Sequence, residues 1–209
     1  MKILRAIFLF NIFIFQANCQ SPSKAKTVTI DPKEFAIKGS VVKALRWNDS
    51  LGTNTLIACQ SSPYDQKGDD RKECIDVYGY HFVSDKKGKS KLWEIVDTES
   101  NCYKDWDLLA MFFVDGICVT DLNKNGVCET WLIYKTLCTT DIRPAKMKIV
   151  MHEGETQYTI SGHSRVPHTS DTFLGGDFEL DSNFKAAPPV FKGYANQLWE
   201  KFKDKRWEE

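Results

Sequence analysis

Short stretches rich in β-branched and aromatic residues alternate along the chain with clusters of Gly, Asn, Asp and Lys. This rhythm is typical of strands separated by turns, and inside the stretches the apolar positions recur with a period closer to two than to 3.6. The pattern predicts strands at 40–47, 55–60, 75–83, 91–96, 108–114, 117–120, 129–134, 147–152, 156–161 and 177–181.

The end of the chain has a helical period. Pro188 and Pro189 stand where the first turn of a helix tolerates proline. The apolar residues that follow recur at helical spacing: Phe191, Tyr194, Leu198 and Phe202. We expect a helix at about 189–205 that caps the sheet, since an exposed apolar stripe is a liability. Docking of a partner on the stripe is the alternative.

Turns that carry an acidic residue and a glycine recur roughly every 35 residues, which raises the question of a propeller. Their similarity ends at those two residue types, so we do not treat them as true repeats. The predicted fold is all-β, mainly an antiparallel meander of hairpins that is propeller-like or a sandwich, with a C-terminal capping helix.

The N-terminus has the features of an export signal. Lys2 and Arg5 precede an apolar stretch at 6–15, and a cleavage region ends at Cys19. The stretch is too short for a permanent span, which needs about 20 residues. We expect a signal peptide at 1–19, a polar tether at 20–33 and a single mainly β domain at 34–209. The protein would then be exported to the periplasm, the cell surface or the medium, with no transmembrane span.

Cys19 leaves two cleavage alternatives open. A general signal peptidase could cut after it, with Ala17 at position −3, and release a soluble protein. Alternatively, Cys19 is lipidated and the tether holds the domain near a membrane, although Asn18 is not the small residue that the lipoprotein pattern prefers. We favour the first alternative.

Six cysteines remain beyond Cys19, and an even number in an exported protein indicates disulfides. None of them forms a C-x-x-C pair, which argues against a zinc ribbon or a thioredoxin-like site. Connectivity does not follow from sequence alone; the pairs we expect are Cys59–Cys74, Cys118–Cys128 and Cys102–Cys138.

The balance of basic and acidic side chains argues against a function that depends on electrostatic attraction to nucleic acid. The chain has 28 basic and 28 acidic side chains, and loss of Lys2 and Arg5 with the signal leaves a net charge of −2. Such a balance provides no field that would attract a polyanion.

One loop matches the opening of a calcium-binding pattern, D-x-[DN]-x-[DN]-G. Calcium takes six to eight oxygen ligands. The candidate ligands are Asp121, Asn123, Asn125, the Val127 carbonyl and Glu129. The loop is not an EF-hand, because Leu132 occupies the twelfth position, and it resembles the shorter loops of FG-GAP and VCBS-type β repeats. The alternative is a plain hairpin turn, for which Asn125-Gly126 is a strong signal.

No catalytic motif stands out, and we expect no catalytic residue. The carboxylates Asp105 and Asp107, or Asp177, Glu179 and Asp181, could act in pairs on a glycosidic bond, but their separation does not follow from sequence. Aromatic residues could stack on sugars. We expect Trp47, Trp93 and Trp131 to belong to the core instead, because each lies in or beside a predicted strand.

Residues 102–165 resemble an uncharacterised family of exported bacterial proteins that are often labelled as surface polysaccharide biosynthesis proteins. The likeness rests on the segments 119–126 and 147–154 with Cys138, Asp141 and Pro144, and it extends to 46–54 and to Leu198-Trp199. It implies a role at the cell envelope and brings no catalytic residue with it.

We therefore expect a non-catalytic envelope or surface protein that binds a glycan or an envelope protein as assembly partner. The alternatives are a carbohydrate-active hydrolase with paired carboxylates and a structural accessory lipoprotein. Calcium is the cofactor that the loop at 121–129 would take.

Overall fold

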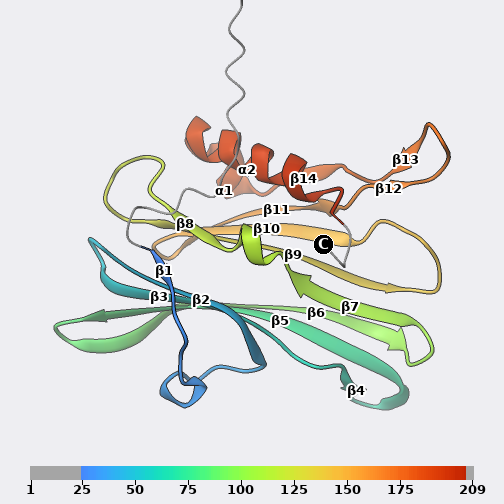
Figure 1. Ribbon diagram of the computed structural model, residues 1–209, viewed down its shortest axis with the longest axis horizontal. Helices are drawn as coiled ribbons and strands as arrows, with labels where there is room; N and C mark the ends of the chain where they lie inside the picture. The colour runs from blue at the N-terminus through green and yellow to red at the C-terminus, as the bar shows by residue number, and fades with distance from the viewer. Residues whose placement is uncertain (1–24, 206–209) are drawn as a thin grey trace, which may run out of the picture.

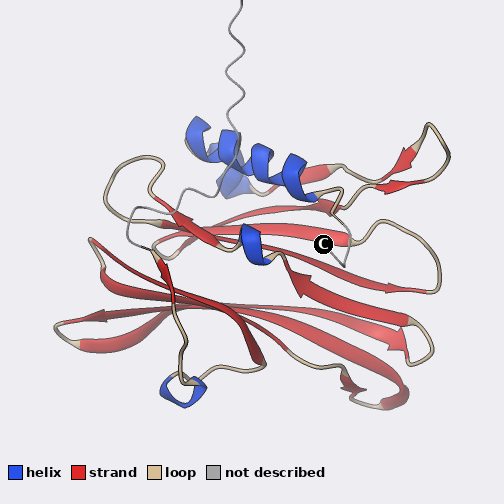
Figure 2. Cartoon of the chain, viewed as in Figure 1, coloured by secondary structure: helices blue, strands red, loops and turns tan. Residues whose placement is uncertain are grey.

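The computed structural model describes residues 25–205, which form two antiparallel β-sheets stacked face to face with α1 (Ser182–Ala186) and α2 (Pro189–Phe202) on one outer side (Figure 1). The predicted all-β fold with a C-terminal helix is confirmed, and the two sheets form a sandwich (Figure 2). The expected signal peptide at 1–19, with Cys19, and the first part of the expected tether lie outside the described residues.

The first sheet, called sheet A here, comes from the first half of the chain. Its long strand β5 pairs with β3 and β4 on different parts of its length and with β6 along nearly all of it. The strands of sheet A are β1 (Lys26–Thr27), β2 (Ser40–Asp49), β3 (Gly52–Gln60), β4 (Tyr64–Gln66), β5 (Asp69–Asp85) and β6 (Gly88–Tyr103).

The second sheet, sheet B, follows the order β14-β11-β10-β9-β7, with β8 also paired to β9. A small hairpin projects from one end of the sandwich (Figure 1). The strands of sheet B are β7 (Asp107–Phe112), β8 (Cys118–Thr120), β9 (Glu129–Thr139), β10 (Lys146–Glu153), β11 (Thr156–His163) and β14 (Phe178–Leu180), and the hairpin consists of β12 (Val166–Pro167) and β13 (Phe173–Leu174).

The helices of the described residues are η1 (Pro32–Glu34), η2 (Val114–Gly116), α1 (Ser182–Ala186) and α2 (Pro189–Phe202). The apolar stripe of α2 is buried against the outer face of sheet B, as the capping interpretation predicts. Among the described residues, no helix is long and apolar enough to cross a membrane.

Strand alternation divides the apolar residues into three layers. Phe35 and the N-terminal segment cover Tyr80 on the outer face of sheet A. Val77 and Leu132 belong to the layer between the sheets. The third layer joins sheet B to the helices and contains Trp131, Ile149, Phe184, Phe191 and Trp199.

The second half of the expected tether at 20–33 belongs to the fold. Lys26 and Thr27 form β1 and pair with β2, and Asp31 caps η1 by accepting a hydrogen bond from the Lys33 N–H. Phe35 is then buried against sheet A. The polar composition that indicated a tether reflects an edge strand and a capped turn, both of which face solvent on one side.

The disulfide Cys102–Cys138 is present and joins the end of β6 to β9, as predicted. The other two predicted pairs are wrong, since Cys59, Cys74 and Cys128 are free and buried.

Strand register explains both errors. Cys59 lies opposite Tyr78, four residues along β5 from Cys74, a shift of about 13 Å that exceeds disulfide reach. Cys118 lies opposite Trp131 on the helix-facing side of sheet B, whereas Cys128 belongs to the layer between the sheets.

Candidate functional site

The turn between β6 and β7 carries two exposed aromatic side chains. The Trp106 N–H donates to the Tyr103 carbonyl at 2.9 Å and closes a four-residue turn. Tyr103 and Trp106 are 38% and 39% exposed, and their ring centroids lie 5.2 Å apart at an interplanar angle of 58°. We call this pair the aromatic platform.

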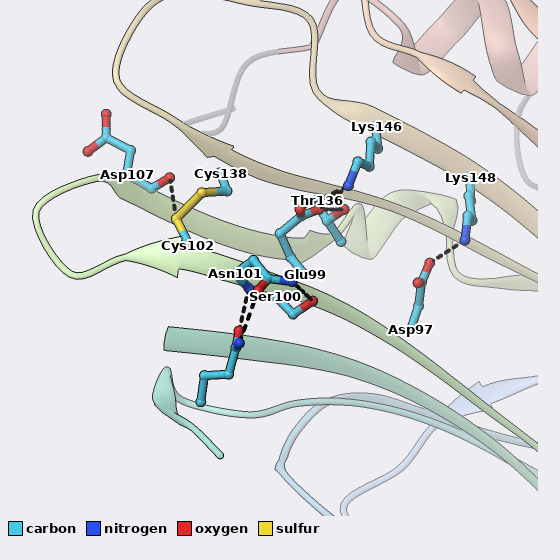
Figure 3. Close-up of polar contacts among 11 residues, drawn as sticks. Asp97, Glu99, Ser100, Asn101, Cys102, Asp107, Thr136, Cys138, Lys146 and Lys148 are labelled. Atoms are coloured by element: carbon cyan, nitrogen blue, oxygen red, sulfur yellow. Dashed lines mark hydrogen bonds and ion pairs between the residues drawn. A yellow bond between two sulfur atoms is a disulfide. The ribbon is translucent and has the colours of Figure 1, made fainter. Parts of the chain in front are cut away.

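The platform is fixed to both sheets. Its neighbour Cys102 is bridged to Cys138 of β9, so the turn is held covalently at its base (Figure 3). Asn101 accepts from the Gln66 side chain at 3.0 Å and donates its backbone N–H back to Gln66 at 2.7 Å. These contacts limit the conformational freedom that a binding partner would have to remove.

Ion pairs between the two sheets continue along β6 from the platform (Figure 3). Glu99 is buried and accepts from Lys146 at 2.9 Å and from the Thr136 hydroxyl at 2.7 Å. Asp97 accepts from Lys148 at 2.7 Å and from the Tyr134 hydroxyl at 2.9 Å. Burial raises the pKa of Tyr134 well above its ordinary value, and the Asp97 carboxylate adds to the shift.

Charged groups of both signs surround the aromatic platform. Lys104 within the turn pairs with Asp65 at 2.7 Å, which raises the pKa of Lys104. The Lys72 ammonium lies 5.1 Å from the centroid of the Tyr103 ring, within cation–π range. Asp69 pairs with Arg71 at 3.1 Å, and the hydrogen bonds from Arg71 lower the pKa of Asp69.

Rigid exposed aromatics with a polar rim are suited to binding a ligand that is apolar on one face and hydroxylated at its edges. Tyr and Trp supply large contact areas at a small cost in side-chain entropy. Trp47, Trp93 and Trp131 are all buried, as expected, whereas the exposed Trp106 was not among the predicted site residues. The available signal was Trp106's position in a Lys-Asp-Trp-Asp segment between two strands, where a tryptophan has no core to enter.

The predicted calcium loop at 121–129 has an internally bonded turn. The oxygens of Asn123 and Asn125 accept from the backbone N–H groups of Asn125 and Val127 at 3.1 and 2.8 Å. Their amide nitrogens both donate to Glu153 Oε1 of β10, at 2.6 and 2.7 Å. Glu153 is thus part of this loop's contacts, although sequence spacing gave no sign of it.

The two carboxylates of the loop have different surroundings. Glu129 is fully buried and accepts from the Thr120 hydroxyl at 2.6 Å and from the Leu122 N–H at 2.9 Å. Burial raises the pKa of Glu129. Asp121 Oδ1 is buried and has no hydrogen-bond partner among the described residues. Among residues 25–205, no group of three or more His, Cys, Asp or Glu side chains is arranged to hold a metal ion.

Asp49 connects this loop to sheet A and was not anticipated from the sequence. Its carboxylate accepts from the Cys128 N–H at 3.1 Å and from Trp47 Nε1 at 3.0 Å. It also accepts from the Leu51 N–H and from Asn54 Nδ2, both at 2.8 Å. One carboxylate therefore joins the β2–β3 turn to the loop that precedes β9.

The carboxylates considered for hydrolysis do not form one cluster. Asp181 caps α1 by accepting from the Phe184 N–H at 2.7 Å, and it also accepts from the Thr159 N–H at 2.7 Å. Asp177 directly precedes the edge strand β14, and Glu179 lies within that strand. Asp105 and Asp107 flank Trp106 on the platform turn. This turn leads into β7, which lies at the opposite edge of sheet B from β14.

Comparison with protein-family models, with curated proteins and with solved structures finds no match to this chain.

Proposed function

We propose that this protein is an exported, non-catalytic glycan-binding domain of the cell envelope and that the aromatic platform is its contact surface. The exposure of Tyr103 and Trp106 on a turn anchored by a disulfide carries the proposal. Such large side chains are normally buried in a small β core, so a fixed exposed pair calls for an explanation in binding.

The surroundings of the platform favour a carbohydrate over an apolar ligand. Lys72, Lys104 and Asp65 offer donors and acceptors around the rings, while the rings themselves offer flat apolar faces. The mixture of signs gives no preference for a strongly charged polymer. The resemblance of residues 102–165 to exported proteins labelled for surface polysaccharide biosynthesis supports the same ligand class.

The test is binding of the purified exported protein to a glycan array, followed by titration calorimetry with the best ligand. Trp106→Ala and Tyr103→Ala should each weaken the affinity at least tenfold, which corresponds to about 1.4 kcal/mol. Phe173→Ala is the matched control, because Phe173 is an exposed aromatic on the β13 hairpin away from the platform turn.

Unchanged affinity in Trp106→Ala, or an equal loss in Phe173→Ala, would contradict the assignment of the platform. A second outcome would also contradict the glycan proposal: no glycan on the array binds, and the wild type captures an envelope protein that Trp106→Ala does not capture. The ligand of the platform would then be a protein.

A further inference from the structure

Three aromatic side chains with unpaired polar atoms meet between the sheets. His81 of β5 packs against Trp93 of β6 with ring centroids 5.5 Å apart, and Trp93 stacks on His152 of β10 at 4.0 Å and 11°. The two histidines are 1% and 3% exposed. Within the described part of the chain, His81 Nδ1, Trp93 Nε1 and His152 Nδ1 are buried without a hydrogen-bond partner.

The tautomer of His81 follows from its neighbours. Asn54 Nδ2 donates to Asp49 and to the Gly52 carbonyl, so Asn54 Oδ1 is left to accept from His81 Nε2 at 2.8 Å. Neutral His81 therefore carries its proton on Nε2. A second proton would go to Nδ1, which is buried beside the Trp93 ring and finds no acceptor among the described residues.

We infer that His81, Trp93 and His152 form an acid-sensitive latch, closed while both histidines are neutral and opened when they are protonated. The stack of Trp93 on His152 joins sheet A to sheet B. Opening would part the sheets at the end where Asp49 holds the loop at 121–129, because His81 contacts Asp49 through Asn54.

The groups around the latch oppose protonation. Burial lowers the pKa of His81 to about 4, and the Asp49 carboxylate offsets only part of this shift. Burial lowers the pKa of His152 to about 4 as well; neighbouring His81 lowers it further, and Gln157 of β11 acts in the opposite direction.

The other contacts do not supply a counterion. On β2 the Trp47 ring packs on His81 at 5.2 Å, and on β9 Thr130 is bonded only to the His152 carbonyl. Strand alternation turns Glu129 and Glu153 to the opposite face of sheet B. Within residues 25–205, Asp49 is therefore the charged group that faces the latch, and it already accepts four hydrogen bonds.

The direction of the pH effect follows from linkage. An unfolded histidine titrates near 6.5, so between about pH 6.5 and 4 the unfolded chain binds more protons than the folded one. Acid then favours opening, and the unfolding equilibrium constant rises by up to tenfold per pH unit for each histidine. Above about pH 6.5 the two groups add no pH dependence.

The experiment measures the unfolding constant in urea at pH 7.5 to 4.5 for the wild type and for His81→Gln and His152→Phe. Glutamine keeps a donor for Asn54, and phenylalanine keeps the stack on Trp93. Each variant should lower the pH slope of log K by about one proton near pH 5. The exposed-site control His168→Gln should not remove this excess slope. Equal slopes in the wild type and both latch variants would overturn the proposal.

A second measurement on the wild type avoids dependence on variants that fail to fold. In proton NMR, substitution of the exposed His163 and His168 identifies their C2 signals, and the two remaining signals, from His81 and His152, should stay unshifted down to pH 5. Amide exchange at Ser50, which donates to the Gly126 carbonyl, should accelerate below pH 5 after correction for intrinsic rates. Titration of the His81 and His152 signals near pH 6.5 would also overturn the latch.

Discussion

At the scale of single residues, side chains that bridge distant segments matter more than the motif that the sequence displays. The D-x-N-x-N-G pattern at 121–126 is recognisable, yet its position depends on Asp49 and Glu153, which lie far away along the chain. A loop pattern indicates local backbone geometry, whereas partners from other strands become visible only with the register of the sheets.

Calcium at Asp121, Asn123, Asn125, Val127 and Glu129 stays a prediction with a direct test. Calcium at ten times its dissociation constant should stabilise the wild type by about 1.4 kcal/mol over chelator-treated protein, seen as a rise in melting temperature. Asp121→Ala should lose this difference. Identical melting temperatures with calcium and with chelator in both proteins would reduce the loop to a hairpin turn.

At the scale of elements, helix α2 covers sheet B and should contribute strongly to stability. Leu198→Ala removes a fully buried side chain from this layer and should cost about 2–5 kcal/mol in the free energy of unfolding. Val190→Ala in the same helix is the matched control, since Val190 is exposed and a change within about 0.5 kcal/mol is expected. Urea unfolding followed by tryptophan fluorescence measures both, and similar values for the two variants would contradict the capping role.

The sequence predicted elements well where a strand is apolar and poorly where it is not. The strand expected at 129–134 is the buried first half of β9, and its apolar residues face both layers. The strand expected at 91–96 is the middle of β6, whose polar ends extend to Gly88 and Tyr103. Polar residues at the exposed ends of long strands match turn composition, so periodicity could not reveal them.

Part of the candidate site could be predicted for the same reason. The Asn-Gly pair at 125–126 indicates a turn region from local chemistry, and Gly126 has a positive φ of 83°. It does not form a two-residue hairpin, because β8 ends at Thr120 and β9 begins only at Glu129. The aromatic platform depends on β6 leaving sheet A and β7 entering sheet B, a crossing that no local pattern encodes.

At the scale of the whole molecule, a disulfide forms only between cysteines whose side chains the sheets bring to the same layer. Alkylation of the denatured, unreduced protein should label Cys59, Cys74 and Cys128, whereas Cys102 and Cys138 should react only after reduction. Peptide mapping by mass spectrometry distinguishes these sites. Labelling of Cys102 without reductant, or protection of Cys59 together with Cys74, would contradict the observed framework.

The pairing of β1 with β2 determines how far the domain could stand from a membrane. If Cys19 carries a lipid, only six residues separate it from Lys26, and a chain of that length spans roughly 20 Å at most. The β1 end of the sandwich would then face the bilayer, and the β6–β7 turn lies at the opposite end (Figure 1). A lipidated form would therefore present Tyr103 and Trp106 outward, toward the space beyond its own membrane.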